Sequence, residues 1–401
     1  MKDSAFPLLG GAASRAWRRA SSPPGRLPGL DLLRAIAIVW VMLFHSYIVG
    51  GLGPHFGWLS RYGWMGVDIF FVLSGFLIGS QVLRPLQQGQ PLPFAGFYAR
   101  RAWRILPAYA MVLALYALAP RVREAAEMQP CWQFVTFSMN LLADYPRKQA
   151  FSQAWSLCVE EHFYLVFPLL AWWLARRPSV ARFIGICAGV AIFGIVLRSA
   201  IWWHDTAIDP PRNWFIEDIY YPTWTRLDGL LAGVMLAVLR TWRSAAWARL
   251  QRHANAILLA GVAVTCLSFW LFRERTGLLA NALGWPVLSI GFALLVFAGA
   301  DRCSLIGRWR VPGAGWIAAI SYSLYLSHKL AFHAVATRLG TSLHGHGAIA
   351  FATYALAVLL LGAALHYLVE RPCLRLRDRH GVMAARPDRP AAPLAASAGA
   401  E

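Results

Sequence analysis

An arginine and a histidine eleven residues apart are the first side chains in the chain that could do chemistry together. Arg34 and His45 lie in the apolar segment GLDLLRAIAIVWVMLFHSYIVGG. In a helix, eleven steps of about 100° return to within about 20° of the starting face and rise about 16 Å. One helix face then carries a guanidinium near one end and an imidazole near the other. The alternatives are an Arg34 that extends to lipid headgroups and a His45 that is a hydrogen-bonded structural residue.

Two adjacent glutamates indicate acid or base chemistry in a second apolar segment. Glu160 and Glu161 lie in AWSLCVEEHFYLVFPLL. A buried glutamate needs partners, and with them it can transfer a proton. Neighbours in a helix point about 100° apart, so at most one of the two faces any single site. The other is then structural.

Four more polar residues lie inside apolar segments: Asp68, Arg226, Asp228 and His328. Asp68 is alternatively a carboxylate at a helix start, and Arg226 and Asp228 can pair with each other or with charges elsewhere. A charged side chain within a membrane usually faces a bundle interior or an aqueous cavity. Six residues are predicted in the outer half of the bilayer, within one polar chamber that opens to the exterior: His45, Asp68, Glu160, Glu161, Asp228 and His328.

A cluster of arginines precedes the third apolar segment. Arg100, Arg101 and Arg104 lie in FYARRAWRILP, at the start of a predicted helix. Guanidinium groups bind phosphates through charge-assisted, often bidentate hydrogen bonds. The cluster is also typical of the cytoplasmic loops of membrane proteins, and the two interpretations are compatible.

The composition defines the elements that must position these residues. Of 401 residues, 58% are hydrophobic and only 14% are charged, with a mean hydropathy of +0.47. A soluble or disordered protein is excluded, and the chain is predicted to be an all-α, polytopic membrane helix bundle. The formal charge of +19 does not indicate nucleic acid, because the basic residues fall between apolar runs. The six cysteines are widely spaced, so neither a disulfide framework nor a metal site is predicted.

Ten membrane-spanning helices are predicted, since about 20 apolar residues cross a bilayer. Their ranges are 29–49, 62–83, 105–120, 155–175, 183–203, 219–239, 255–272, 281–300, 315–337 and 347–369. Most of the 38 Lys and Arg residues fall in one set of alternate loops, which places both termini in the cytoplasm. The expected location is the cell inner membrane.

Three segments complete the predicted organisation. Residues 1–28 form a basic cytoplasmic segment, 29–370 the transmembrane domain, and 371–401 a basic and then disordered cytoplasmic tail. Residues 131–143 are too short an uncharged run to cross the bilayer, so a re-entrant or interfacial segment is expected there. No soluble catalytic domain is expected.

Several of these motifs together resemble the integral-membrane acyltransferase 3 family, whose members acylate surface polysaccharides and related acceptors. The resemblance extends over most of 29–370. Its motifs are Arg34-x10-His45, GVDIFFVLSGFLI at 66–78, Arg100, Arg101 and Arg104, WSLCVEEHFYLVFP at 155–168, RLDGLLAG at 226–233 and SYSLYLSH at 321–328. The chain departs from the family pattern at His162, where Gln is frequent, and at Ser327, where Trp is frequent.

The resemblance implies an acyl-CoA donor, acetyl-CoA by family frequency, used from the cytoplasm, and a glycan hydroxyl as acceptor on the far side. His45 is then the leading catalytic residue, as a base or as an acyl acceptor, and Arg34 with the arginine cluster binds the donor. Glu160 or Glu161 is expected to fix the imidazole tautomer. Arg226 or Tyr322 is a candidate oxyanion donor.

The alternative function is a transporter or flippase that uses the buried charges as a substrate pathway. Such folds often have two halves with matching interrupted helices. Residues 29–175 and 219–369 show no such correspondence.

Overall fold

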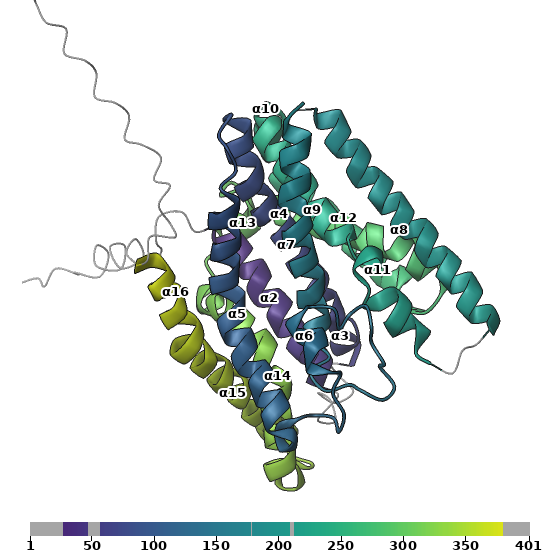
Figure 1. The fold of residues 1–401 in the computed structure, drawn as a ribbon, viewed down its shortest axis with the longest axis vertical. Coiled ribbons are helices and arrows are strands. Elements are labelled where there is room, and N and C mark those ends of the chain that lie inside the picture. Colours follow the sequence, from purple (N-terminus) through teal and green to yellow (C-terminus); the bar gives the residue numbers. More distant parts are fainter. Residues whose placement is uncertain (1–26, 47–56, 178, 209–211, 380–401) are drawn as a thin grey trace, which may run out of the picture.

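The computed structural model describes residues 27–46, 57–177, 179–208 and 212–379. These residues form a helical bundle, and the β pairing among them is a single isolated bridge between Met128 and Ala150. The all-α prediction is therefore confirmed. Figure 1 shows how the helices are arranged. Residues 1–26 of the predicted segment 1–28 and residues 380–401 of the predicted tail 371–401 lie outside the described residues.

Each of the ten predicted ranges contains a helix. The helices are α2 (Pro28–His45), α4 (Gly66–Gln87), α5 (Phe94–Leu118), α7 (Ala154–Ala175), α8 (Val180–Ile208), α9 (Asp228–Trp242), α11 (Ala254–Leu271), α12 (Trp285–Gly299), α14 (Ala314–Leu343) and α15 (Gly347–Leu365). Short helices join them: α3 (Gly57–Arg61), α6 (Cys131–Val135), α10 (Ser244–Gln251), α13 (Leu305–Arg308) and α16 (Arg371–Arg379).

Seven helical stretches among the described residues are long and apolar enough to cross a membrane. They are Pro28–His45, Gly63–Gln87, Ala154–Ala175, Val180–Ile208, Ala254–Leu271, Ala280–Gly299 and Gly347–Arg379. The protein is therefore a multi-pass membrane protein. Of the other three predicted spans, α9 has only 15 residues and α5 carries the arginine cluster, so their crossing, like that of α14, stays a prediction.

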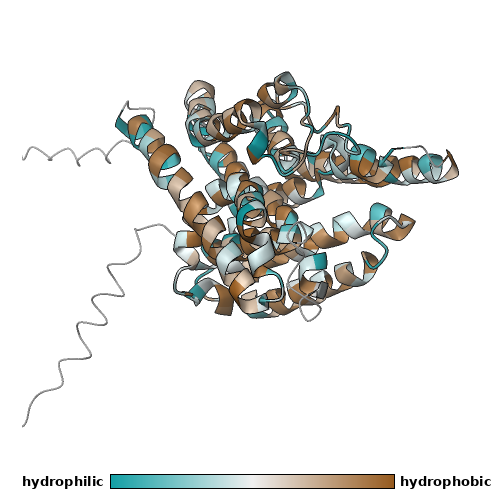
Figure 2. Ribbon diagram, turned by 90° about the horizontal axis from the view of Figure 1, so that it is seen from below, coloured by the Kyte–Doolittle hydropathy of each residue, from teal (hydrophilic) through white to brown (hydrophobic). Residues whose placement is uncertain are grey.

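Large apolar side chains cover the outside of the bundle. Ile192 and Phe193 of α8, Leu259 of α11 and Leu360 of α15 are all more than half exposed. Figure 2 shows hydrophobic residues, in brown, along many of the helices. Such surfaces suit lipid chains and would aggregate in water.

Helix α4 lies at the centre of the fold and packs against α2, α7, α9 and α12. Its contact with α9 depends on glycine. A Cβ atom at Gly75 would lie 2.1 Å from the Leu230 carbonyl oxygen, and one at Gly233 would lie 2.2 Å from that of Val72. Small residues let helix backbones approach this closely in membranes. The two backbones hold Asp68 and Asp228, near the starts of their helices, in fixed positions.

The predicted re-entrant segment at 131–143 forms α6 and a series of turns that enter the protein. Phe134 and Asn140 are fully buried. The Tyr109 hydroxyl donates to the Phe134 carbonyl at 3.0 Å, and Asn140 Nδ2 donates to Thr223 Oγ1 at 2.9 Å. Other residues of the segment are exposed, Trp132 and Val135 among them, so this irregular backbone is partly buried in the protein.

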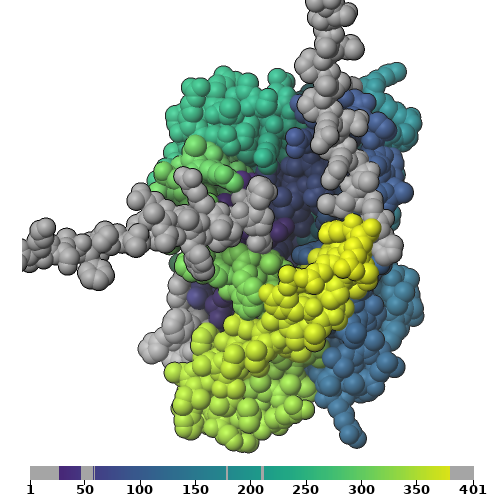
Figure 3. All heavy atoms as spheres, turned by 90° about the vertical axis from the view of Figure 1, so that its left-hand side faces the viewer, coloured from purple at the N-terminus to yellow at the C-terminus, as the bar shows by residue number. Residues whose placement is uncertain are grey.

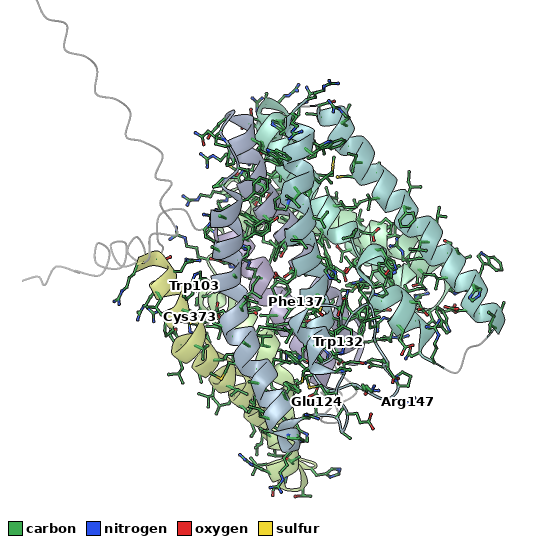
Figure 4. The ribbon with its side chains drawn as sticks, viewed as in Figure 1. Trp103, Glu124, Trp132, Phe137, Arg147 and Cys373 are labelled. Carbon is green, nitrogen blue, oxygen red and sulfur yellow. The ribbon has the colours of Figure 1, made fainter. Side chains whose placement is uncertain are left out.

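The last described helix continues the transmembrane domain into the predicted tail. After α15, a π-helical turn at His366–Glu370 leads directly into α16. Helix α16 packs against α5. In Figure 4, Trp103 of α5 and Cys373 of α16 lie beside each other. Residues 371–379 are thus helical and docked on the bundle.

Candidate active site

The structure brings together two histidines that are 283 residues apart. His45 lies at the last residue of α2, and His328 lies within α14. His328 Nε2 is 3.2 Å from His45 Nδ1, and the ring centroids are 4.8 Å apart. His328 is fully buried, whereas His45 is only partly buried. Sequence reasoning singled out both residues but did not predict that they touch.

The hydrogen bonds of this pair define how its protons are arranged when both rings are neutral. His328 Nδ1 lies 2.8 Å from the Tyr325 carbonyl oxygen, which can only accept, so this nitrogen carries the proton. His328 Nε2 is then an acceptor. His45 Nδ1 faces this acceptor and the Val41 carbonyl oxygen at 3.0 Å, so it also carries its proton. The lone pair of His45 therefore lies on Nε2.

A cavity of about 230 Å³ adjoins His45. It is lined by Val41, Phe44, His45, Trp64, Val67, Tyr145, Ser152, Gln153, Trp155, Ile216, Tyr220, Tyr221, Arg275, Tyr325 and Lys329. Most of the wall is aromatic, and several of its rings stack on one another, such as Trp155 on Tyr221. Of the predicted site residues, only His45 lines this cavity.

A buried lysine on the cavity wall escaped the sequence analysis. Lys329 follows His328 directly. Its Nζ donates to Ser152 Oγ at 2.7 Å and lies 3.5 Å from Glu124 Oε1. The Glu124 carboxylate also accepts from the Tyr116 hydroxyl at 2.8 Å. Figure 4 shows Glu124 near the lower end of α5. A buried carboxylate so placed compensates the lysine charge beside the imidazole pair.

The second missed residue is Arg275, which sequence reasoning counted only as part of the loop 273–280. Its guanidinium lies on the cavity wall, with Cζ 4.5 Å from the Trp64 ring centroid and 4.4 Å from that of Tyr220. Arg273, two residues earlier, is exposed. Nothing in the local sequence distinguishes the two arginines.

The charges on α4 and α9 form two separate ion pairs. Arg226 Nη2 donates to Asp68 Oδ1 at 2.9 Å. Asp228 instead accepts from Arg198, at 2.8 Å from Nη1 and 3.2 Å from Nη2. Arg226 and Asp228 are thus paired with charges elsewhere and not with each other. Both pairs connect helices that are distant in sequence.

The adjacent glutamates lie apart from the cavity. The Ser74 hydroxyl donates to Glu160 Oε1 at 2.5 Å, and the Tyr164 hydroxyl donates to Ser74 Oγ at 3.2 Å. Neither Glu160 nor Glu161 lines the cavity. The contacts described at His45 Nδ1 come from Val41 and His328, so we assign the predicted role of orienting the imidazole to those two.

The arginines gather in another part of the interior, beside the glutamates. Arg101 lies with Cζ 6.0 Å from the Tyr164 ring, and Arg104 forms an ion pair with Glu370. Arg34 is close enough to Arg104 and Glu160 to interact electrostatically with both. Arg100 is partly buried at the same level of α5. Glu370, which sequence reasoning missed, also accepts from Ser323 at 2.7 Å.

Two sequence interpretations need correction on this geometry. The polar residues do not line one chamber: His45 lines the cavity with His328 behind it, the ion pairs lie between helices, and the glutamates lie with the arginines. Nor does either proposed oxyanion donor line the cavity. The Tyr322 hydroxyl donates to the Ile105 carbonyl at 2.8 Å, and Arg226 lies behind the Trp155 and Tyr220 rings.

The remaining chemistry of the described residues is limited. Among them, no three His, Cys, Asp or Glu side chains gather as metal ligands. The six cysteines are free thiols. His162, where the family pattern often has Gln, has Nδ1 2.7 Å from Thr223 Oγ1 and so fixes α7 to the segment before α9. These features leave the histidine pair and its cavity as the best-formed site.

The protein is thus an integral membrane helix bundle in which a histidine lines an internal cavity and arginines gather elsewhere in the interior. Such an arrangement suits a polar substrate. Comparison with known families makes this specific. Residues 27–369 match the model of the family described as "Acyltransferase domain". The chain belongs to this family, as the sequence motifs predicted.

The similar curated proteins are longer than this chain. The peptidoglycan O-acetyltransferase of Listeria monocytogenes is 27% identical over 333 residues, which are 75% of this chain and 49% of that protein. The O-acetyltransferase of Staphylococcus aureus is 26% identical over 324 residues, 76% of this chain and 50% of the relative. The chain thus spans about half the length of the curated relatives it matches. No solved structure matched it.

Proposed function

We propose that the protein is a membrane-embedded O-acyltransferase that moves an acetyl group from cytoplasmic acetyl-CoA to a hydroxyl of a surface or exported glycan. The observation that carries the proposal is the histidine pair, which leaves the lone pair of His45 on Nε2 at a cavity. Membership of the acyltransferase domain family supports the reaction type. The names of the relatives support acetyl as the group and a glycan as the acceptor.

In the proposed reaction His45 is the catalytic base. The acceptor oxygen forms a bond to the thioester carbonyl carbon and gives its proton to His45 Nε2. The tetrahedral adduct expels the CoA thiolate, which takes this proton and leaves as the free thiol. A route through an acyl-histidine begins at the same lone pair, since Nε2 is then the nucleophile. His328 is a positioning residue in both routes, because its Nε2 accepts a hydrogen bond from His45 Nδ1–H and so fixes the tautomer of His45.

Lys329 is our candidate for stabilising the oxyanion of the adduct. Its ammonium lies on the cavity wall, and Ser152 and Glu124 hold it in place. A cation fixed before the reaction needs no rearrangement as negative charge develops on the carbonyl oxygen. This assignment replaces Arg226 and Tyr322.

The donor is proposed to enter through the arginine cluster. Arg100, Arg101 and Arg104 would bind the CoA phosphates, with Arg34 on the way to His45, because Arg34 lies on the same helix about 16 Å from that histidine. Figure 3 shows this face of the molecule hollowed above α16, with atoms of the first helices visible inside. Ten membrane crossings, both termini in the cytoplasm and an inner-membrane location complete the proposal.

The direct test uses detergent-solubilised protein with radiolabelled acetyl-CoA and a glycan acceptor. Wild-type protein is expected to transfer label, and His45→Ala is expected to lose transfer while it accumulates normally. The exposed His253 supplies the control, since His253→Ala should keep wild-type turnover. Undiminished transfer by His45→Ala would refute the role of this residue. Movement of the glycan across vesicles without CoA would instead support a transporter.

A further inference from the structure

Arg275 is surrounded by aromatic rings on the cavity wall. Its Cζ atom lies 4.4 Å from the Tyr220 ring centroid, 4.5 Å from Trp64, 5.0 Å from Phe215 and 6.0 Å from Phe44. These rings fix the guanidinium by stacking and cation–π attraction.

One whole edge of this guanidinium is without a hydrogen-bond partner. Nε and Nη2 are both buried from solvent, and neither donates to any atom of the described residues. These two atoms carry the parallel N–H bonds that bind a carboxylate in the bidentate arrangement. Buried guanidinium donors are expensive to leave unpaired, so a pair of them at a cavity indicates a ligand.

The charges of the cavity wall indicate the sign of that ligand. Arg275 and Lys329 are its cationic side chains, and no carboxylate is among the described lining residues. The Glu124 carboxylate lies behind the wall and compensates Lys329. The Asp68 carboxylate pairs with Arg226 and is close enough to Arg275 to interact with it electrostatically, but it does not line the cavity. Of the two cations, Lys329 is thus paired, whereas Arg275 has hydrogen-bond donors without partners among the described residues.

We propose that Arg275 binds a carboxylate of the acceptor, so that the enzyme selects an acidic glycan over its neutral equivalent. This inference rests on the proposed function and names the class of its acceptor. Phe44 bridges the two ends of the site, since its ring lies 6.0 Å from Arg275 Cζ and 5.1 Å from the His45 ring. An acidic sugar can span this separation. Its carboxylate would lie at Arg275 and a hydroxyl of the same or the next sugar at His45 Nε2.

The test compares two acceptors that differ only in this charge. The probes are the disaccharide of N-acetylglucosamine and N-acetylmuramic acid with its carboxylate free, and the same disaccharide with that group converted to the primary amide. Wild-type kcat/KM with acetyl-CoA is expected to favour the acid about tenfold to a hundredfold, the range of charge-assisted hydrogen bonds. Arg275→Met should remove this preference by lowering kcat/KM for the acid alone. Arg275→Lys should keep part of it, because the charge remains without the fork.

Arg273→Met is the matched control, since Arg273 is exposed and two residues away, and it should keep the full preference. A wild-type enzyme that uses both acceptors equally would overturn the inference and leave the proposed function intact. So would an Arg275→Met variant that retains the preference. Either result would mean that Arg275 does not select the acceptor by its charge.

A binding measurement separates this inference from the chemistry. Calorimetric titration of His45→Ala with each disaccharide needs no turnover. Tighter binding of the acid, lost when Arg275→Met is added, supports the inference even if no acetyl transfer is found, in which case the proposed function fails alone. Equal binding of the two probes, or binding of neither, overturns it. Unfolding temperatures of the variants in detergent verify that each is folded.

Discussion

Two buried arginines of the same chain differ in how completely their donors are used. Arg198 is fully buried, with Nε donating to the Asn281 carbonyl at 2.7 Å, and Nη1 and Nη2 donating to Asp228. Arg275 lies among aromatic rings on the wall of a cavity, and its Nε and Nη2 have no hydrogen-bond partner among the described residues. The first arrangement is complete without any ligand, and the second is not. A structural charge therefore differs from a candidate binding group in whether all its hydrogen-bond donors have partners, more than in how deeply it is buried.

The same difference separates two regions of the bundle. Between α4, α8 and α9, each ion pair connects two distant segments and stabilises helix packing. Around the cavity, His45 lines the space and has its Nδ1 proton placed by Val41 and His328. The first region should respond to substitution with a loss of stability, and the second with a loss of activity.

Replacement of His45 should give the largest loss of activity without a loss of stability. General acid–base catalysis contributes about 10²- to 10⁴-fold, so kcat/KM of His45→Ala should fall by about this factor. Initial rates of label transfer from acetyl-CoA measure it, and unfolding temperature should stay at the wild-type value. A variant that is equally active but unstable would place His45 with the structural region.

Arg198→Met should show the opposite behaviour. It leaves Asp228 charged and buried without its partner, which costs about 3–5 kcal/mol in comparable pairs. Thermal unfolding followed by tryptophan fluorescence should detect a lower midpoint, and the protein that stays folded should keep its activity. Arg198→Met with Asp228→Asn removes the stranded charge and should recover part of the loss. An unchanged midpoint in the single variant would contradict the distinction.

His328 tests the boundary between the two regions, because it is fully buried yet touches His45. His328→Ala removes the acceptor for His45 Nδ1 and should lower kcat about tenfold to a hundredfold with little change in the KM for acetyl-CoA. His328→Gln can still accept through its amide oxygen and should recover part of kcat. Equal losses in both variants, with lowered stability, would make His328 a packing residue.

The smallest effect is expected at the arginine cluster, where several cations share one role. Arg101→Ala should raise the KM for acetyl-CoA about tenfold and leave the KM for the glycan nearly unchanged. Steady-state rates with each substrate varied in turn measure both. Equal increases in the two KM values would argue against a separate donor site.

The fold could be predicted from sequence because long apolar runs favour membrane helices. Each predicted range contains a helix, and seven helical stretches among the described residues are long and apolar enough to cross a membrane. His45 could be identified from its place in such a run. Its partner could not, since α2 and α14 lie 283 residues apart at this contact and periodicity does not say which helices are neighbours. Arg275 could not be distinguished from Arg273, because only the folded structure shows that Arg275 lines the cavity and that Arg273 is exposed. The role of Lys329 could not be predicted, because its partner Glu124 lies more than 200 residues away in the sequence.

The central claim is that acetyl groups from one side of the membrane reach an acceptor on the other side through His45. Proteoliposomes of uniform orientation, with radiolabelled acetyl-CoA supplied only on the side of the arginine cluster and glycan only on the opposite side, test it directly. We predict labelled glycan with wild-type protein and none above background with His45→Ala at equal protein content. Equal labelling by the variant, or labelling only when both substrates share a compartment, would contradict the account.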